Sequence, residues 1–195
     1  MFGYLVGKLV NLSPSQTFLD VGGVGYELQL TLPTYEAIRE KETCKLYTHL
    51  QIREDAWVLY GFATPDEKEA FQKLLGISGV GAATARILLS SISPSDLYRI
   101  ISNGDSKALE QVKGIGAKTA QRIVLELRGK LPETIGSGEI STPLHNTPAQ
   151  DALIALIGLG IAKSAAETAL KKAEKQLAEG SAHVEDWIKA ALKNL

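Results

Sequence analysis

Hydrophobic and polar positions follow two different rhythms along the chain, and the change comes near residue 64. Before it, short runs rich in β-branched and aromatic residues are separated by glycine, proline and charged residues, which is typical of strands. Five strands are expected, over Phe2–Leu12, Gln16–Val21, Gly25–Leu32, Cys44–Ile52 and Trp57–Phe62. Pro33 opens a segment, Thr34–Arg39, that favours one or two helical turns. This pattern predicts a small OB-type β-barrel, with an SH3-like barrel as the alternative.

From Pro65 onward the apolar residues recur every three to four positions, which predicts helices. Thr64 is the expected N-cap of the first helix, with Pro65 at its first position and Glu67 completing a capping box. Further short helices are expected between breaks at residues 76–81, 93–94, 103–104 and 114–116. The last segment predicts a compact three-helix bundle, with breaks near 158–160 and near Gly180.

A stretch of unusual composition separates the two helical parts. Of the seventeen residues in 132–148, ten are Pro, Gly, Ser or Thr, and none is Lys or Arg. Such a segment buries too little apolar surface to offset its ordering entropy, so a flexible linker is expected. The sequence therefore predicts a multidomain α+β protein, with a barrel over 1–63, a helical domain over 64–131 and a three-helix domain over 149–195.

Charge is distributed unevenly along the chain. The 195 residues carry 21 Lys+Arg and 22 Asp+Glu, for a formal net charge of −1. Residues 64–131 nevertheless hold 10 basic and 7 acidic side chains, and residues 132–147 hold 0 and 2. A basic segment beside an acidic one is able to orient a polyanion.

The composition also bears on the protein's setting. Cys44 is the only cysteine, so no internal disulfide is expected, and the three scattered histidines predict no metal site. The longest apolar stretch, 152–162, is about half of the ~20 residues that span a bilayer, and the N-terminus lacks a signal-peptide pattern. We therefore expect a cytoplasmic protein that binds neither metal nor membrane.

The helical middle contains an internal repeat at an offset of 35 residues. Residues 74–85 align with 109–120, and six of the twelve positions are identical. Each copy is expected to run from a helix through a glycine turn into a second helix. The turns are Gly79-Val80-Gly81 and Gly114-Ile115-Gly116.

The residues of these turns fit the binding of phosphate. The glycines permit a tight reversal and leave N–H groups unshielded at the start of a helix, where the helix dipole favours an anion. The aliphatic residue between them can fill the gap between the two helices. Lys118 and Arg122 follow the second turn on one helix face, with Thr119 between them. A plain corner between two helices is the alternative, but two copies in register favour phosphate binding.

Nucleotide cofactors are not expected at these turns. A P-loop requires glycines where this chain has Val112 and Ala117. The dinucleotide fingerprint requires a third glycine where the two copies have Thr84 and Thr119.

The paired turns resemble the helix-hairpin-helix motif, which binds the DNA backbone without reading sequence. The order of the modules, and the runs Met1–Gly7, Arg53–Phe62 and Gly114–Ala120, resemble the RuvA family over essentially the whole chain. That family implies a non-catalytic protein that binds Holliday junctions in recombination, DNA repair and the SOS response. The implied assembly is a homotetramer or an octamer, and the implied partners are four-way junction DNA, the hexameric ATPase RuvB and the resolvase RuvC.

The resemblance also implies roles for individual residues. From the residues alone, Glu54 and Asp55 favour a solvated turn between two strands. The resemblance instead implies that they match the family's acidic pin, which repels phosphates at the junction centre. The small C-terminal domain is expected to bind the motor, and its candidate contacts are Leu153, Leu156 and Leu159.

The first turn departs from the family pattern. Ala82 and Ala83 replace a Pro-Lys pair, so one phosphate-contacting cation is missing, and Arg86 is the candidate to replace it. Three other functions remain open at this point: a nuclease or glycosylase that docks through the hairpins, a single-strand-binding protein, and a protein-interaction adaptor without DNA binding.

Overall fold

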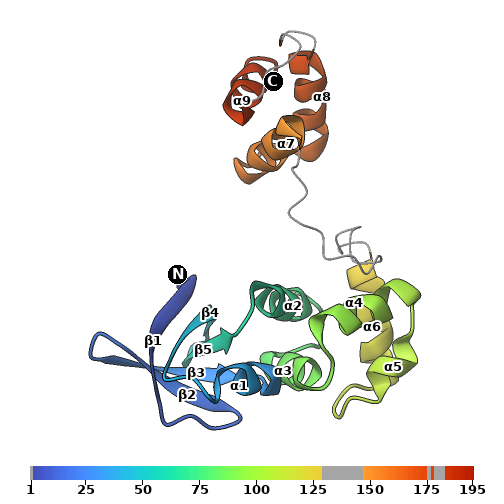
Figure 1. Cartoon of the computed structure of the whole chain (residues 1–195). Helices are drawn as coiled ribbons and strands as arrows, with labels where there is room; N and C mark the ends of the chain where they lie inside the picture. The colour runs from blue at the N-terminus through green and yellow to red at the C-terminus, as the bar shows by residue number, and fades with distance from the viewer. Residues whose placement is uncertain (1, 129–146, 175–176, 178–182) are drawn as a thin grey trace. The chain divides into compact units, whose positions relative to one another are not determined.

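The computed structural model describes residues 2–128, 147–174, 177 and 183–195 (Figure 1). The chain divides into two compact units, 1–138 and 139–195, which are described separately. Most of the expected linker, residues 132–146, lies outside the described residues.

The N-terminal part of the first unit is a closed five-stranded barrel with strand order β1-β2-β3-β5-β4. Its elements are β1 (Tyr4–Val10), β2 (Gln16–Val21), β3 (Val24–Leu30), α1 (Leu32–Ile38), β4 (Thr43–Ile52) and β5 (Trp57–Phe62). All neighbouring strands are antiparallel except β3 and β5, which pair in parallel. This is the order of an OB barrel, so the OB prediction is confirmed and the SH3-like alternative is excluded.

Five helices follow the barrel in the first unit (Figure 1), and the predicted breaks between them are confirmed. They are α2 (Pro65–Leu75), α3 (Ala82–Ser91), α4 (Pro94–Asn103), α5 (Ser106–Glu110) and α6 (Ala117–Arg128). Thr64 is the N-cap of α2, and its hydroxyl accepts from the Glu67 N–H at 3.2 Å. The expected reciprocal half of the capping box is wrong, because the Glu67 carboxylate is buried and accepts hydrogen bonds from Thr31 and Thr34 instead.

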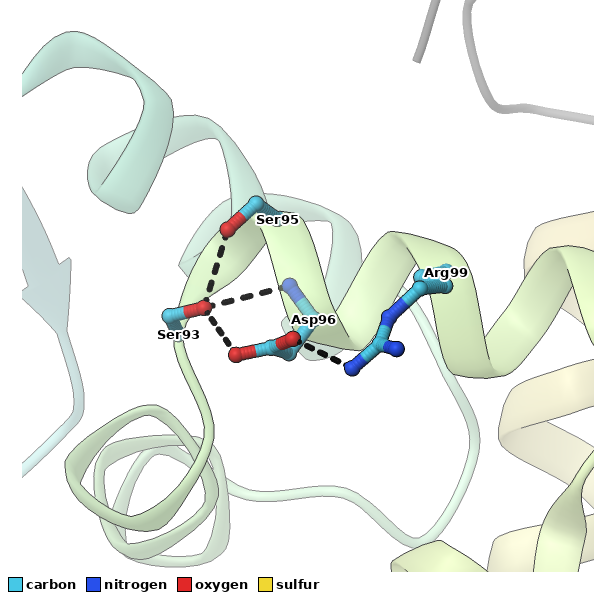
Figure 2. Close-up of polar contacts among 4 residues, drawn as sticks. All are labelled: Ser93, Ser95, Asp96 and Arg99. Atoms are coloured by element: carbon cyan, nitrogen blue, oxygen red, sulfur yellow. Dashed lines mark hydrogen bonds and ion pairs between the residues drawn. The ribbon is translucent and has the colours of Figure 1, made fainter. Parts of the chain in front are cut away.

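The start of α4 shows why the chain breaks at Ser93 (Figure 2). The Ser93 hydroxyl accepts from the Asp96 N–H at 3.1 Å and donates to the Asp96 carboxylate at 2.7 Å. Arg99, one turn later, donates to the other carboxylate oxygen at 2.7 Å. The hydrogen bond from Ser93 and then the one from Arg99 hold the pKa of Asp96 below its ordinary value. This cap and Pro94 at the first helical position fix where α4 begins.

The barrel and the helices share one hydrophobic core. Tyr60 and Phe62, at the end of β5, pack against Phe71 of α2 with ring centroids 4.9 Å apart in both pairs. The same cluster continues through Leu88 of α3 to Ile123 of α6, both fully buried. The end of β5 and the two glycine turns therefore share one hydrophobic core.

The second unit contains α7 (Pro148–Gly158), α8 (Lys163–Glu174) and α9 (Val184–Leu192), as the sequence predicted. Helix α7 begins at Pro148, one residue before the expected start, and the N–H of Thr147 donates to the Gln150 side chain at 3.2 Å. The core of this second unit is built mainly from alanines, with two leucines: Ala152, Leu156, Ala166, Ala169, Leu170, Ala173 and Ala191. The break expected near Gly180 lies outside the described residues.

Candidate nucleic-acid interface

The two glycine turns have the same backbone hydrogen bonds, 35 residues apart. The N–H groups of Val80 and Ile115 donate to the carbonyls three residues earlier, those of Ile77 and Val112 respectively, at 3.0 Å. The N–H groups of Ala85 and Ala120 donate to the carbonyls of Gly81 and Gly116 respectively, at 2.9 Å. Gly79 and Gly114 both have φ +89°, a conformation that favours glycine. The sequence repeat is therefore a structural repeat, formed by α2–α3 and α5–α6.

The glycines leave the outer face of each turn open. A Cβ built on Gly79, Gly81, Gly114 or Gly116 would have no described heavy atom beyond its immediate neighbours within 4 Å. The N–H groups of residues 81–84 and 116–119 have no partner among the described residues. Each turn thus presents free donors at the positive end of a helix, where a phosphate oxygen is able to accept them.

Val80 and Ile115 do not belong to this open face. Both are only 5% exposed and lie in the shared hydrophobic core. Their N–H groups are already bonded within the turn. The expectation that their side chains fill the gap between two helices is confirmed. Their contact with DNA stays a prediction.

The cations that follow the second turn have different surroundings. Lys118 is exposed and pairs with no described residue, and Thr119 beside it is half-buried. Arg122 donates from Nη1 to the carbonyl of Ser78 at 3.0 Å, and its Nε lies 4.0 Å from a carboxylate oxygen of Glu126. Since Ser78 immediately precedes the first glycine turn, Arg122 brings a positive charge to the turn whose own helix starts with Ala82 and Ala83.

Arg86 does not replace the missing cation. Its guanidinium donates to Leu30 O at 3.0 Å, Gln29 Oε1 at 2.9 Å and Ser15 O at 3.0 Å, all in the barrel. Burial lowers the pKa of this side chain. The expectation for Arg86 is therefore wrong, because its donors hold α3 against the barrel.

Glu54 and Asp55 lie at the tip of the β4–β5 hairpin. The N–H of Arg53 donates to Ala56 O at 2.9 Å, and the last cross-strand pair before the tip is Ile52 with Trp57. The side chains of residues 52–57 are all exposed. The two carboxylates therefore lie at one end of the β4–β5 pair, and at the other end β5 leads into α2.

The sequence analysis assigned no role to Ile52 and Trp57, the apolar pair next to this tip. Ile52 is 63% exposed and Trp57 is 76% exposed. Trp57 opens a strand with the run Trp-Val-Leu-Tyr-Gly-Phe, whose burial increases toward α2. The tryptophan at the start of this strand is the feature of the sequence from which an exposed apolar pair could have been predicted.

The three candidate partner contacts on α7 are not equivalent. Leu156 is fully buried in the three-helix core, so it is removed from the candidate surface. Leu153 is half-buried, and Leu159 is 66% exposed. Ile154 and Ile157 are also exposed, because their helix positions face away from Leu156.

Two features of the described residues bear on other functions. No described helix has both the length and the apolar character needed to cross a membrane. The described part of the chain also contains no group of three or more His, Cys, Asp or Glu side chains placed to hold a metal ion.

Comparisons with known proteins agree over the whole chain. Residues 1–61 match the family model of the RuvA N terminal domain, residues 71–130 that of a SAM-like helix-hairpin-helix tandem, and residues 147–195 that of the RuvA C-terminal domain. Several curated relatives carry the name Holliday junction branch migration complex subunit RuvA.

Three of these relatives match this chain from end to end. Those from Christiangramia forsetii and Flavobacterium psychrophilum are 40% and 41% identical, with 100% of each chain covered. The relative from Bordetella petrii is 42% identical, over 100% of this chain and 99% of its own. On these matches and on the fold, the chain belongs to the RuvA family.

Proposed function

We propose that this protein is a non-catalytic DNA-binding subunit of a branch migration complex, and that it binds Holliday junctions by their shape. One observation carries the proposal: two helix-hairpin-helix turns with the same hydrogen bonds and free N–H groups share one core with a strand pair that carries two carboxylates at its tip. Backbone donors contact phosphates without reading bases, so binding is independent of sequence.

The two hairpins bind the phosphate backbone of one DNA arm. The free N–H groups at 81–84 and 116–119 donate hydrogen bonds to phosphate oxygens, while Lys118 adds an exposed charge beside the second turn. Arg122 serves the first turn, since it is hydrogen-bonded to Ser78 and still 44% exposed at its side chain. The chain thereby supplies one cation to each turn although both come from α6.

The hairpin tip acts as a specificity device at the crossover. Carboxylates that face DNA weaken binding to continuous duplex, because they repel its phosphates. Where strands diverge, Glu54 and Asp55 meet fewer phosphates and the repulsion is smaller. A homotetramer, or an octamer of two such rings, would place four tips around the centre and one hairpin pair on each arm.

The C-terminal unit recruits the motor. Exposed apolar side chains in a group mark interaction surfaces, and α7 presents Ile154, Ile157 and Leu159 to solvent. We assign this face to a hexameric ATPase of the RuvB type, with a RuvC-type resolvase as a further partner in the cytoplasm. Replacing Leu159 with Ser should weaken capture of the motor and leave junction affinity unchanged.

The test compares a synthetic immobile four-way junction, a matched duplex and a single strand across a salt series, with and without magnesium. We expect the junction to bind most tightly, affinity to fall steeply with salt, and no strand to be cut. Cleavage with magnesium would show a nuclease instead. Preference for the single strand would show a single-strand-binding protein, and no salt-sensitive affinity would leave only an adaptor.

A further inference from the structure

One short segment of the barrel is hydrogen-bonded to both helices of the first hairpin. This segment, residues 29–34, covers the end of β3 and the start of α1. Helix α2 reaches it through Glu67, and helix α3 reaches it through Arg86 and Ser90. The described parts of the barrel and of the first hairpin are thus tied at one place by side chains that come from far along the chain.

The contact from α2 is buried. Glu67 is 4% exposed, and its two carboxylate oxygens accept separately from the hydroxyls of Thr31 and Thr34, the latter at 2.7 Å. The Thr34 hydroxyl also accepts from the N–H of Ala63, at the joint between β5 and α2, at 2.9 Å. The carboxylate therefore joins α1, the end of β5 and α2 in one network.

The contact from α3 uses all three nitrogens of one guanidinium. Nε, Nη1 and Nη2 of Arg86 go to three different acceptors in the barrel, two at the end of β3 and one, Ser15 O, before β2. The Ser90 hydroxyl, one turn along the same helix, accepts from the Leu32 N–H at 3.1 Å. A planar fork with three acceptors fixes the rotation of α3 as well as its distance.

These contacts lie on the path between the hairpins and the acidic tip. Strand β3 pairs in parallel with β5, Leu30 facing Gly61, and β5 carries Glu54 and Asp55 just before its other end. We call the contacts of Glu67, Arg86 and Ser90 with residues 29–34 the seam. Apolar packing beside the seam, such as Phe71 on Phe62, holds the parts together without direction. Buried polar contacts add direction, since they are satisfied in one geometry only.

We propose that Glu67 and Arg86 are positioning residues that fix the first hairpin relative to the acidic tip, and that this fixed geometry produces the preference for a junction over duplex. The second claim, on the preference for a junction, rests on the proposed function. Duplex binding needs only the hairpins, whereas junction binding needs hairpins and tip to engage at once. Loosening the seam should therefore weaken junction binding selectively.

The geometry is measured first, without DNA. Spin labels on Ala56→Cys and Ala83→Cys, in a Cys44→Ala background and diluted with unlabelled chain, report the distance between tip and hairpin. We expect a narrow distribution for the unaltered seam and a broad or shifted one for Arg86→Met. Glu67→Leu removes both acceptor oxygens and should broaden or shift it as well, whereas Glu67→Gln keeps one of them and should have a smaller effect. A narrow, unshifted distribution in Arg86→Met or in Glu67→Leu would overturn the positioning role of that residue.

Binding is measured second, with the same seam variants lacking labels. Arg86→Met should lower junction affinity about tenfold, which is the loss expected if the displaced hairpin gives up one charge-assisted hydrogen bond to DNA. Duplex affinity should change little. Ile123→Val is the matched control, because it loosens the same core in α6 away from the seam. Equal losses on junction and duplex, or the same loss in Ile123→Val, would overturn the specificity role.

The two measurements separate the two claims. If the unaltered protein showed no junction preference, the proposed function would fail, and the distance distributions would still decide whether the seam fixes the geometry. If the distribution broadened while the junction-to-duplex ratio stayed constant, the seam would be structural only and the inference wrong.

Discussion

The substitution Gly81→Ala tests whether the glycine turns bind phosphate or only form a corner between two helices. Gly81 has φ −88° and ψ 171°, which any residue adopts, and a Cβ there would meet nothing within 4 Å. An added methyl therefore disturbs no described packing. It would instead stand on the open face, between an approaching phosphate and the free N–H groups of α3.

The effect on stability should be close to zero. Replacing Gly with Ala restricts the unfolded chain and stabilises by about 0.4–1 kcal/mol where the backbone fits. Gly81 is also an N-cap, where Ala is less favourable than Gly by about 0.5–1 kcal/mol. These contributions nearly cancel, so the free energy of unfolding should change by less than about 0.5 kcal/mol. Gly114→Ala is a poorer test, because φ +89° adds strain of about 1–2 kcal/mol.

The effect on binding should be large. Losing one hydrogen bond to a charged phosphate costs about 1.5–3 kcal/mol, which corresponds to about 10- to 150-fold in Kd per contact. Urea unfolding and fluorescence-anisotropy titration of a labelled junction measure the two quantities on one preparation. Gly158→Ala, in the open at the end of α7, is the matched control and should leave Kd unchanged. Unchanged junction affinity in Gly81→Ala would refute phosphate contact and leave the turn as a corner between two helices.

Three other changes test separate parts of the proposal. Glu54→Gln combined with Asp55→Asn should tighten duplex binding more than junction binding in competition titrations; an unchanged ratio would remove the role of the tip. Lys118→Gln should reduce the slope of log K against log salt by about 0.9 per lost phosphate contact, and the same slope as the unaltered protein would mean that this side chain stays off the DNA. Burial raises the pKa of Tyr98 to about 12, so its contribution to stability is complete below pH 10 and is lost as the pH rises from 10 to about 12. Tyr98→Phe should flatten the fall in the free energy of unfolding over that range, which urea titrations at several pH values would show or deny.

Local patterns in the sequence predicted most of the fold. The helix breaks, the five strands and the repeated turns each depend on residues near one another in the chain, such as Thr64 with Pro65 or Gly79 with Gly81. Propensity, periodicity and capping act over that same range, so the sequence carries this information directly.

Contacts between distant segments were not predictable in the same way. Glu67 fits a local capping box, yet its carboxylate finds better partners in Thr31 and Thr34, which the chain brings close only after the barrel closes. Arg86 likewise looked like a free cation because its acceptors lie 56 or more residues away. Leu156 and Leu159 are both apolar in one run, and only the packing of three helices decides which one is buried.

The 35-residue repeat has a consequence for how its two copies share their tasks. Arg86 in the first copy corresponds to Gln121 in the second, and Lys118 in the second corresponds to Ala83 in the first. In the first copy Arg86 is hydrogen-bonded to the barrel, whereas in the second copy Lys118 stays exposed and Arg122 donates to Ser78, next to the turn of the first copy. The two copies thus share the hydrogen bonds of their turns but differ in what their basic side chains do: those of the first hold the barrel, and those of the second remain at the surface of the turns.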